Sequence, residues 1–237
     1  MGVCQIYTPT IPETDENGNH YILSEEAILP EIYAMVDCVD NGIVLYSSNI
    51  VASGTCGAEG NNGDNLTWIL DDEGVLTISG TGAMANWNWE GSPWYANKDK
   101  IESVVIEDGV TSIGKYSFPG FRNLASVELP NSMVSIGDYA FCYCNSLENI
   151  ELPNSVASIG DYAFYYCESL KNIKIPSSIK DIGLNAFNYC YYLNIEVDEN
   201  NEVYSSEDGV LYNKDKTEII KCPVAKENIN IPESVTS

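Results

Sequence analysis

Positive charge is scarce in this chain of 237 residues. There are 11 Lys and Arg against 35 Asp and Glu, which gives a formal net charge of −24. All of the basic residues lie at or after Lys98. This distribution argues against nucleic-acid binding, because contacts to phosphates need a positive face. A strongly acidic surface instead keeps a protein soluble and repels anionic membranes.

Long apolar runs are missing as well. No stretch of 18 apolar residues occurs, so we expect no membrane-spanning helix and no insertion into a membrane. Residues 1–52 contain no Lys or Arg and no long apolar core, so we expect no signal peptide in this chain.

The sequence offers little for catalysis or for metal binding. His20 is the only histidine. A Cys–His enzyme that used Cys56 would need both groups in one cleft and a third group to orient them. Segments 15–19 and 198–202 are acidic, but neither matches the twelve-residue calcium loop with its final bidentate Glu. We therefore expect no catalytic residues, no metal site and no cofactor.

What the chain does contain is a repeat of 23 residues. Four blocks follow one another without a gap, and the second and third agree at 17 of 23 positions. The blocks are 104–126, 127–149, 150–172 and 173–195. A period in the twenties is typical of a solenoid, in which each coil is too small to bury its own apolar face and must stack on its neighbours.

The third block shows how one coil is built. Apolar residues alternate over 150–152, which predicts a short strand with one buried face, and Pro153 ends it because proline cannot donate to a sheet. Segment 163–167 has apolar residues at spacings that predict one short helical turn over the core. Equivalent residues recur in every block, so stacked coils should form ladders of like side chains roughly 4.8 Å apart. One such column is Phe118, Phe141, Phe164 and Phe187.

The motif I-x-L/I-P-x-x-V/I-x-x-I-G-x-x-A-F-x-x-C-x-x-L, carried by residues 104–195, resembles the BspA-like (Treponema pallidum-type) leucine-rich repeat. The first block departs from it, with Ser117 for Ala and Phe121 for Cys, as is common in a coil next to a cap. The resemblance implies an α/β leucine-rich-repeat solenoid, right-handed and β-rich, with a parallel concave sheet and short helical turns. It also implies a bacterial or protist protein, extracellular or on the cell surface, that serves adhesion or protein binding.

Three segments lie outside the regular blocks. Residues 53–103 predict a β-rich N-terminal cap with a hairpin between the runs 66–70 and 75–78. Residues 196–228 predict an inserted hairpin, built from 209–212 and 218–220, within a solenoid that spans 104–237. Residues 1–52 are assigned as an N-terminal extension or small module. The cap's aromatic residues, which we expect to plug the end of the core, are Trp87, Trp89, Trp94 and Tyr95.

The cysteines of the repeats fall into one column. Cys144, Cys167 and Cys190 are 23 residues apart, so their side chains point the same way, which is poor geometry for a disulfide. They also lack the convergent four-ligand arrangement of a zinc site. We predict that they are core residues, because Cys behaves as a small hydrophobe. Cys142 lies outside the column and is predicted near the surface.

Two surfaces are candidates for binding. The first is the concave strand face, whose candidate partner-binding residues are Ser126, Glu128, Asn149, Glu151, Asn172 and Lys174. Repeat proteins commonly bind proteins on such faces, although the same residues would suit a merely solvated face. The second is aromatic, since the chain has 16 Tyr against 5 Phe. Two tyrosine ladders are expected, one of Tyr116, Tyr139 and Tyr162 and one of Tyr143, Tyr166 and Tyr189.

Tyrosine rings with one apolar side and a polar tip suit protein or sugar interfaces. The simpler interpretation is that the ladders stack on each other and seal the convex edge. We therefore predict a non-enzymatic scaffold that binds a protein ligand on a host or bacterial surface. The alternative is a carbohydrate-binding module that uses exposed Tyr and Trp side chains.

Overall fold

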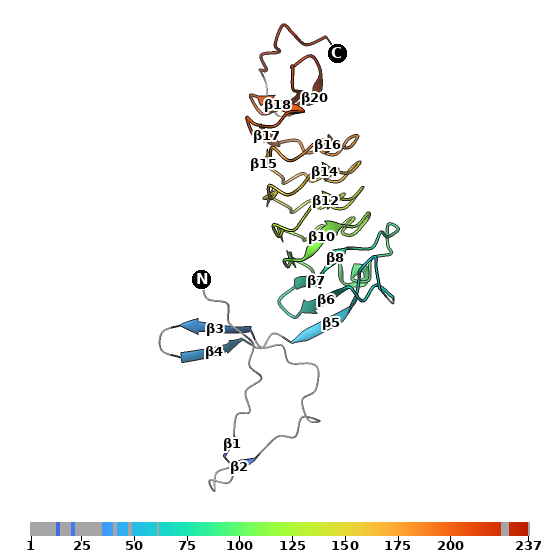
Figure 1. Ribbon diagram of the computed structural model, residues 1–237, viewed down its shortest axis with the longest axis vertical. Helices are drawn as coiled ribbons and strands as arrows, with labels where there is room; N and C mark the ends of the chain where they lie inside the picture. Colours follow the sequence, from blue (N-terminus) through green and yellow to red (C-terminus); the bar gives the residue numbers. More distant parts are fainter. Residues whose placement is uncertain are drawn as a thin grey trace. The chain divides into compact units, whose positions relative to one another are not determined.

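The computed structural model describes residues 13–14, 20–21, 35–39, 42–46, 49–60, 62–223 and 228–236 (Figure 1). The chain divides into two compact units, Met1–Asn49 and Ile50–Ser237. The described residues of the first unit form two antiparallel strand pairs, β1 (Glu13–Thr14) with β2 (His20–Tyr21), and β3 (Met35–Val39) with β4 (Gly42–Tyr46).

The second unit begins with an antiparallel meander. Its strands, which pair in chain order, are β5 (Ile50–Thr55), β6 (Leu66–Asp71) and β7 (Val75–Gly80). The hairpin predicted from the runs 66–70 and 75–78 is therefore confirmed. Strand β7 then pairs in parallel with β9 (Ser103–Ile106), so the meander and the repeats share one sheet. Leu66, Leu70 and Leu76 are fully buried, and the meander thereby covers the end of the repeat core.

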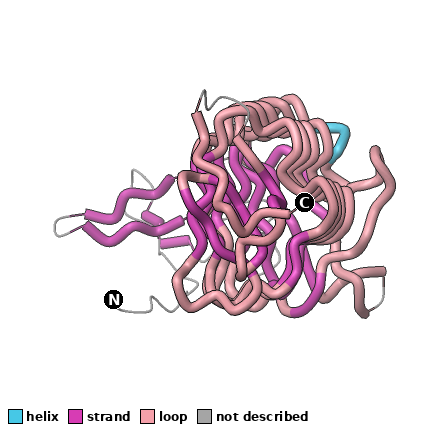
Figure 2. Tube along the Cα trace, turned by 90° about the horizontal axis from the view of Figure 1, so that it is seen from above, coloured by secondary structure: helices cyan, strands magenta, loops and turns pink. Residues whose placement is uncertain are grey.

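The repeats wind into about four coils, and each coil contributes a strand to two parallel sheets (Figures 1 and 2). The eight-stranded sheet continues from β9 through β11 (Ser126–Glu128), β13 (Asn149–Ile150), β15 (Asn172–Ile175) and β17 (Asn194–Val197). The five-stranded sheet contains β8 (Gly82–Ala83), β10 (Val110–Ile113), β12 (Ser135–Ile136), β14 (Ser158–Ile159) and β16 (Asp181–Ile182). The register follows the sequence period, since Ser112 partners Ser135 and Ser135 partners Ser158.

The core repeats from coil to coil. The rings of Phe118, Phe141, Phe164 and Phe187 stack with centroids 5.3 to 5.6 Å apart. Phe141 and Phe164 are fully buried, as the apolar column predicted. The column of Cys144, Cys167 and Cys190 is also buried, and each thiol donates a hydrogen bond to a carbonyl of the preceding coil.

Cys142 was predicted near the surface, and this is wrong: its side chain is buried. The equivalent residue in the next coil, Tyr165, lies between the two tyrosine ladders, with its ring 5.4 Å from Tyr162 and 5.6 Å from Tyr143. A tyrosine at this position reaches solvent and is half-buried. The short cysteine side chain does not reach past the flanking rings, so it is covered.

The short helical turns expected over 163–167 and its equivalents are not observed. Tyr162 and Tyr166 have φ values of +56° and +61°, which interrupt a right-handed helix. The amide of Phe164 donates to the carbonyl of Ala186 in the next coil at 2.8 Å, whereas the amides of Tyr165 and Cys167 donate to carbonyls three residues earlier, as in turns. Over the described part of the chain, the helical content is one short 3-10 element, η2 (Tyr95–Asn97).

The recurring glycine marks a close approach of two coils. Gly160 does not have positive φ, but a Cβ atom there would lie 2.5 Å from the backbone nitrogen of Asp138. Real Cβ atoms do not come that close to backbone, so the neighbouring coil leaves room for glycine alone.

The repeat continues past the predicted start of the insertion. Asn172 in β15 partners Asn194 in β17, so the fourth coil is one residue shorter than the others. The insertion then forms an antiparallel sheet of β18 (Tyr204–Glu207), β19 (Val210–Asn213) and β20 (Ile219–Lys221). The pairing of β19 with β20 confirms the predicted hairpin, whereas β18 was not predicted.

Where the repeat resumes after the insertion, it bonds to the inserted hairpin in the way that a regular coil bonds to the coil before it. Ser178 Oγ donates to the Val156 carbonyl of the preceding coil, at 2.6 Å. Ser234 Oγ, in the resumed repeat, donates to the Lys216 carbonyl at 2.8 Å. The same type of coil-to-coil bond is therefore made to the turn between β19 and β20.

Candidate functional site

The outer face of the eight-stranded sheet, called here the strand face, is formed by side chains that alternate with the core residues. Val127, Ile150 and Ile173 are buried in successive strands. The six candidate residues of this face are all exposed: Ser126, Glu128, Asn149, Glu151, Asn172 and Lys174. Ser126, Asn149 and Asn172 form one column, because Ser126 partners Asn149 and Asn149 partners Asn172. Glu128, Glu151 and Lys174 each follow two residues later in the sequence.

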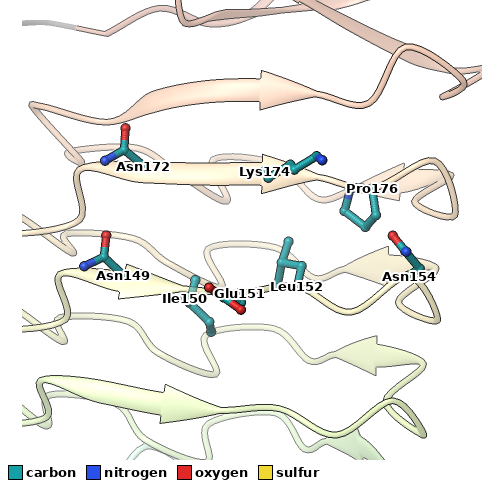
Figure 3. Close-up of a pocket in the computed structure, with 8 residues that line it drawn as sticks. All are labelled: Asn149, Ile150, Glu151, Leu152, Asn154, Asn172, Lys174 and Pro176. Carbon is teal, nitrogen blue, oxygen red and sulfur yellow. The ribbon is translucent and has the colours of Figure 1, made fainter.

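A shallow depression of about 450 Å³ lies on this face between the third and fourth coils (Figure 3). Four of the six candidates line it, together with four residues that the sequence analysis did not select: Ile150, Leu152, Asn154 and Pro176. Figure 3 shows Asn149 and Asn172 at matching places on neighbouring strands, with Lys174 on the upper strand and Pro176 just past its end. The depression thus combines amides, one carboxylate, one ammonium and an apolar edge.

The charged groups of the strand face are poorly neutralised. Lys174 is in register with Glu196, yet neither belongs to an ion pair among the described residues. Asp198, beyond the end of β17, has its pKa lowered by hydrogen bonds from Asn200, with a smaller contribution from Lys174. Glu128, Glu151 and Lys174 can therefore pair with charges on a partner.

Both expected tyrosine ladders are present. The rings of Tyr116, Tyr139 and Tyr162 stack at centroid distances of 4.7 and 4.8 Å; we call these the first ladder. The rings of Tyr143, Tyr166 and Tyr189 stack at 5.0 and 4.6 Å and form the second ladder. Trp89 contacts the first ring of each ladder, with centroids 6.0 Å from both Tyr116 and Tyr143. Burial is the main cause that raises the pKa of Tyr139 and Tyr143.

Every ladder tyrosine has a left-handed backbone. Their φ values lie between +53° and +63°, a region that is unusual for a bulky side chain. Other residues make the same turn in neighbouring coils. Gly120 does so one coil before Tyr143, and Asn185 does so one coil after Tyr162. The conformation costs an L-residue roughly 1–2 kcal/mol. The turns do not require tyrosine, so the rings contribute through their own contacts.

Stacking leaves few ring faces free. Tyr166 is covered on both sides by Tyr143 and Tyr189, so its edge rather than its face is turned outward. Tyr189, the last ring of this ladder, stacks on Tyr166 and is 43% exposed. A sugar ring that stacks on an aromatic face would find such a face at Tyr189 but not along the ladder.

The tryptophans of the cap have different environments. Trp94 is fully buried, stacks on Phe118 at 5.3 Å and donates its indole N–H to the Ser117 carbonyl at 2.8 Å. It plugs the end of the core, as predicted. Trp89 is 39% exposed and does not.

The structure assembles no catalytic or metal constellation among the residues that it describes. Burial raises the pKa of the Cys56 thiol to about 12, so this group is not a thiolate at neutral pH. In the described residues, no group of three His, Cys, Asp or Glu side chains could hold a metal ion. Asp198 Oδ1 accepts hydrogen bonds from Asn200, which uses this carboxylate in a turn. The acidic segment 15–19 and the His20 side chain lie outside the described residues.

No helix in the described ranges is long and apolar enough to cross a bilayer.

These features define a leucine-rich-repeat solenoid. The BspA type leucine-rich repeat region matches residues 91–218 in six copies, and the chain belongs to this family. The recognition of the family from the motif is thereby confirmed.

The chain is also similar to solved structures of bacterial leucine-rich repeat proteins. A leucine-rich repeat protein from Eubacterium ventriosum is 34% identical, with a TM-score of 0.63, and the match covers 78% of this chain and 55% of that one. The leucine-rich repeat protein of T. pallidum is 25% identical over 58% of this chain and 71% of its own, with a TM-score of 0.44. A leucine-rich cell surface protein from Faecalibacterium prausnitzii is 24% identical over 78% of this chain and 66% of its own, with a TM-score of 0.49. No curated protein matches the chain.

Proposed function

We propose that this protein is a non-enzymatic scaffold, extracellular or on the cell surface, that binds another protein through the strand face. The observation that carries the proposal is the depression between the third and fourth coils. It brings two opposite charges, Glu151 just after β13 and Lys174 in β15, beside the amides of Asn149 and Asn172. A protein partner can match such a mixture of charges, amides and apolar edge more readily than a purely apolar ligand can.

The proposed site lies on rigid elements. The strand backbones are held by parallel pairing on both sides, from β11 through β13 to β15. The side chains below the face, Ile150 and Ile173, are buried and fix the orientation of the exposed residues that alternate with them. A preformed face loses little conformational entropy on binding, which favours recognition.

Carbohydrate binding through Tyr143, Tyr166 and Tyr189 is a weaker proposal. Binding of a sugar to aromatic residues commonly uses an open ring face, and the ladder provides this only at Tyr189. A glycan array would detect it: binding that disappears in Tyr189→Asn but persists in Tyr166→Asn would place a sugar on the terminal ring.

The protein-binding proposal is tested by screening the full chain against immobilised host matrix and bacterial surface proteins. A variant with Glu128→Lys, Glu151→Lys and Lys174→Glu changes the net charge by +2 and reverses the local pattern. Glu218→Lys changes the net charge equally, on an exposed residue of the insertion. We expect the triple variant to lose binding and the control to keep it. Binding that survived in the triple variant would exclude the strand face.

A further inference from the structure

The first ladder already accommodates one cation from its own chain. The Lys115 ammonium lies 5.4 Å from the ring centroid of Tyr116 and 5.9 Å from that of Tyr139, within the range of a cation–π contact. It is also 3.3 Å from Asp138 Oδ2, so a carboxylate and two stacked rings hold the charge together.

One coil further along, the same arrangement recurs without a lysine. Asp138 Oδ1 accepts a hydrogen bond from the Asp161 amide at 3.0 Å, and Asp161 Oδ1 accepts one from the Leu184 amide at 2.7 Å. The two carboxylates therefore have the same place in their coils. Oδ2 of Asp138 faces Lys115, whereas Asp161 belongs to no ion pair in the described ranges.

The residue that would supply the second cation is an aspartate. Lys115 is followed at intervals of 23 residues by Asp138 and Asp161. Moving the Lys115 ammonium by one coil brings it to the Asp161 carboxylate and to the rings of Tyr139 and Tyr162. Asp161 is exposed, and both rings are half-buried, so this position is open to another molecule.

The presence of a tyrosine at position 162 is not explained by the turn alone, which supports a further role for its ring. Tyr162 keeps φ at +56°, while Asn185 makes the same turn, also at +56°, in the following coil. Asparagine is more readily accommodated in this conformation than a bulky ring. The ring is nevertheless present where the unpaired carboxylate lies and absent in the coil that has Leu184 in place of the carboxylate.

We propose that Asp161, Tyr139 and Tyr162 form a docking site for an arginine side chain of a partner protein. Arginine fits because its planar guanidinium can pair with the carboxylate while it lies beside the stacked rings, as the Lys115 ammonium lies beside Tyr116 and Tyr139. The net charge of −24 favours approach of a basic segment. The site lies in the turns after β12 and β14, apart from the strand face, and the two surfaces can be tested separately.

The test uses a fluorescein-labelled Gly-Arg-Gly-Arg-Gly peptide and the full chain, followed by fluorescence anisotropy at about 0.15 M ionic strength, where distant charges are screened. A peptide with citrulline in place of arginine has a similar shape without the charge. We expect the arginine peptide to bind at least about tenfold more tightly than the citrulline peptide. Asp161→Asn and Tyr162→Asn should each weaken binding by about fivefold or more. Asp161→Glu should retain most of it.

The matched control is Glu218→Gln, which removes one negative charge from an exposed residue of the insertion. It should change the affinity by less than about twofold, since a screened charge away from the site contributes little. Equal losses in Glu218→Gln and Asp161→Asn would show general attraction to an acidic protein and overturn the site. So would equal affinity for the two peptides. Tyr162→Asn is checked by its denaturation midpoint, so that a folding defect is not mistaken for lost binding.

Discussion

Tyr162 and Asn185 occupy equivalent positions of successive coils, share a φ value of +56°, and are joined by a hydrogen bond of 3.0 Å from Asn185 Nδ2 to the Tyr162 hydroxyl. One position of the repeat thus accepts both a residue that suits the left-handed turn and one that does not. Substitutions at Tyr162 can therefore separate the free-energy cost of the left-handed backbone from the stabilisation by ring stacking.

Tyr162→Ala and Tyr162→Asn should therefore differ in stability. Both lose the stacking on Tyr139, which is worth about 0.5–1.5 kcal/mol beyond area burial. Only alanine also retains the strain of the turn, which asparagine relieves. We expect Tyr162→Ala to be less stable than Tyr162→Asn by about 1 kcal/mol in urea unfolding. Equal stabilities would mean that the left-handed turn costs little here.

Phe164→Ala should destabilise the protein by about 3–5 kcal/mol. Phe164 is fully buried and stacks on both Phe141 and Phe187, so its removal empties a space between two neighbours. Phe187 stacks on Phe164 at one side and lies next to the insertion, and Phe187→Ala should cost less. Chemical denaturation of both variants decides this. A cost below about 1 kcal/mol for Phe164→Ala would contradict its place in the core column.

Asn201 anchors the insertion to the fourth coil. Its buried amide donates to the carbonyls of Pro176 and Ile179 and accepts from the amides of Val203 and Tyr204. Asn201→Ala leaves these groups without partners, at about 1–3 kcal/mol for each one that water cannot reach.

We expect Asn201→Ala to lower the free energy of unfolding by at least about 3 kcal/mol. Asn200→Ala, next to it and exposed, is the matched control and should cost less than about 1 kcal/mol. Similar costs for the two variants would show that the insertion does not depend on this amide.

Alkaline pH should destabilise the fold through its buried thiols. Burial raises the pKa of Cys142 from 9.0 to about 12. The folded state thus keeps a proton that the unfolded state releases above pH 9, so the stabilising contribution is complete below pH 9 and falls as pH rises toward 12. The melting temperature should drop over this range, and the drop should be smaller in Cys142→Ala. An identical pH dependence in both proteins would show that this thiol does not contribute.

Much of the fold follows from the sequence because each coil repeats the same apolar pattern. The register of β10, β12 and β14 follows the 23-residue period, and Phe164 is buried where the period placed it. The prediction of helical turns was wrong because the spacing of apolar residues indicates which side chains share a face but not the sign of φ. A left-handed Tyr162 gives the same spacing of apolar residues with a different backbone.

The candidate surfaces were less readable from the sequence. Alternation indicated that Glu151 and Lys174 are exposed, but it could not show that Leu152 and Pro176 border the same depression. The contact of Lys115 with the first ladder was also missed. In the sequence, this contact is indicated only by the column of Lys115, Asp138 and Asp161, each followed by a tyrosine of the first ladder. These residues are 23 positions apart, and they become neighbours only when the coils stack.

Site-specific photo-crosslinking tests the proposed function most directly. A photoreactive amino acid replaces Asn172 in the depression or Glu218 on the insertion, and each protein is illuminated with a partner found in the binding screen. Asn172 is exposed on the strand face, and Glu218 is exposed as well. We predict covalent capture of the partner from position 172 and none from position 218. Capture from position 218 alone would contradict the strand face as the binding surface.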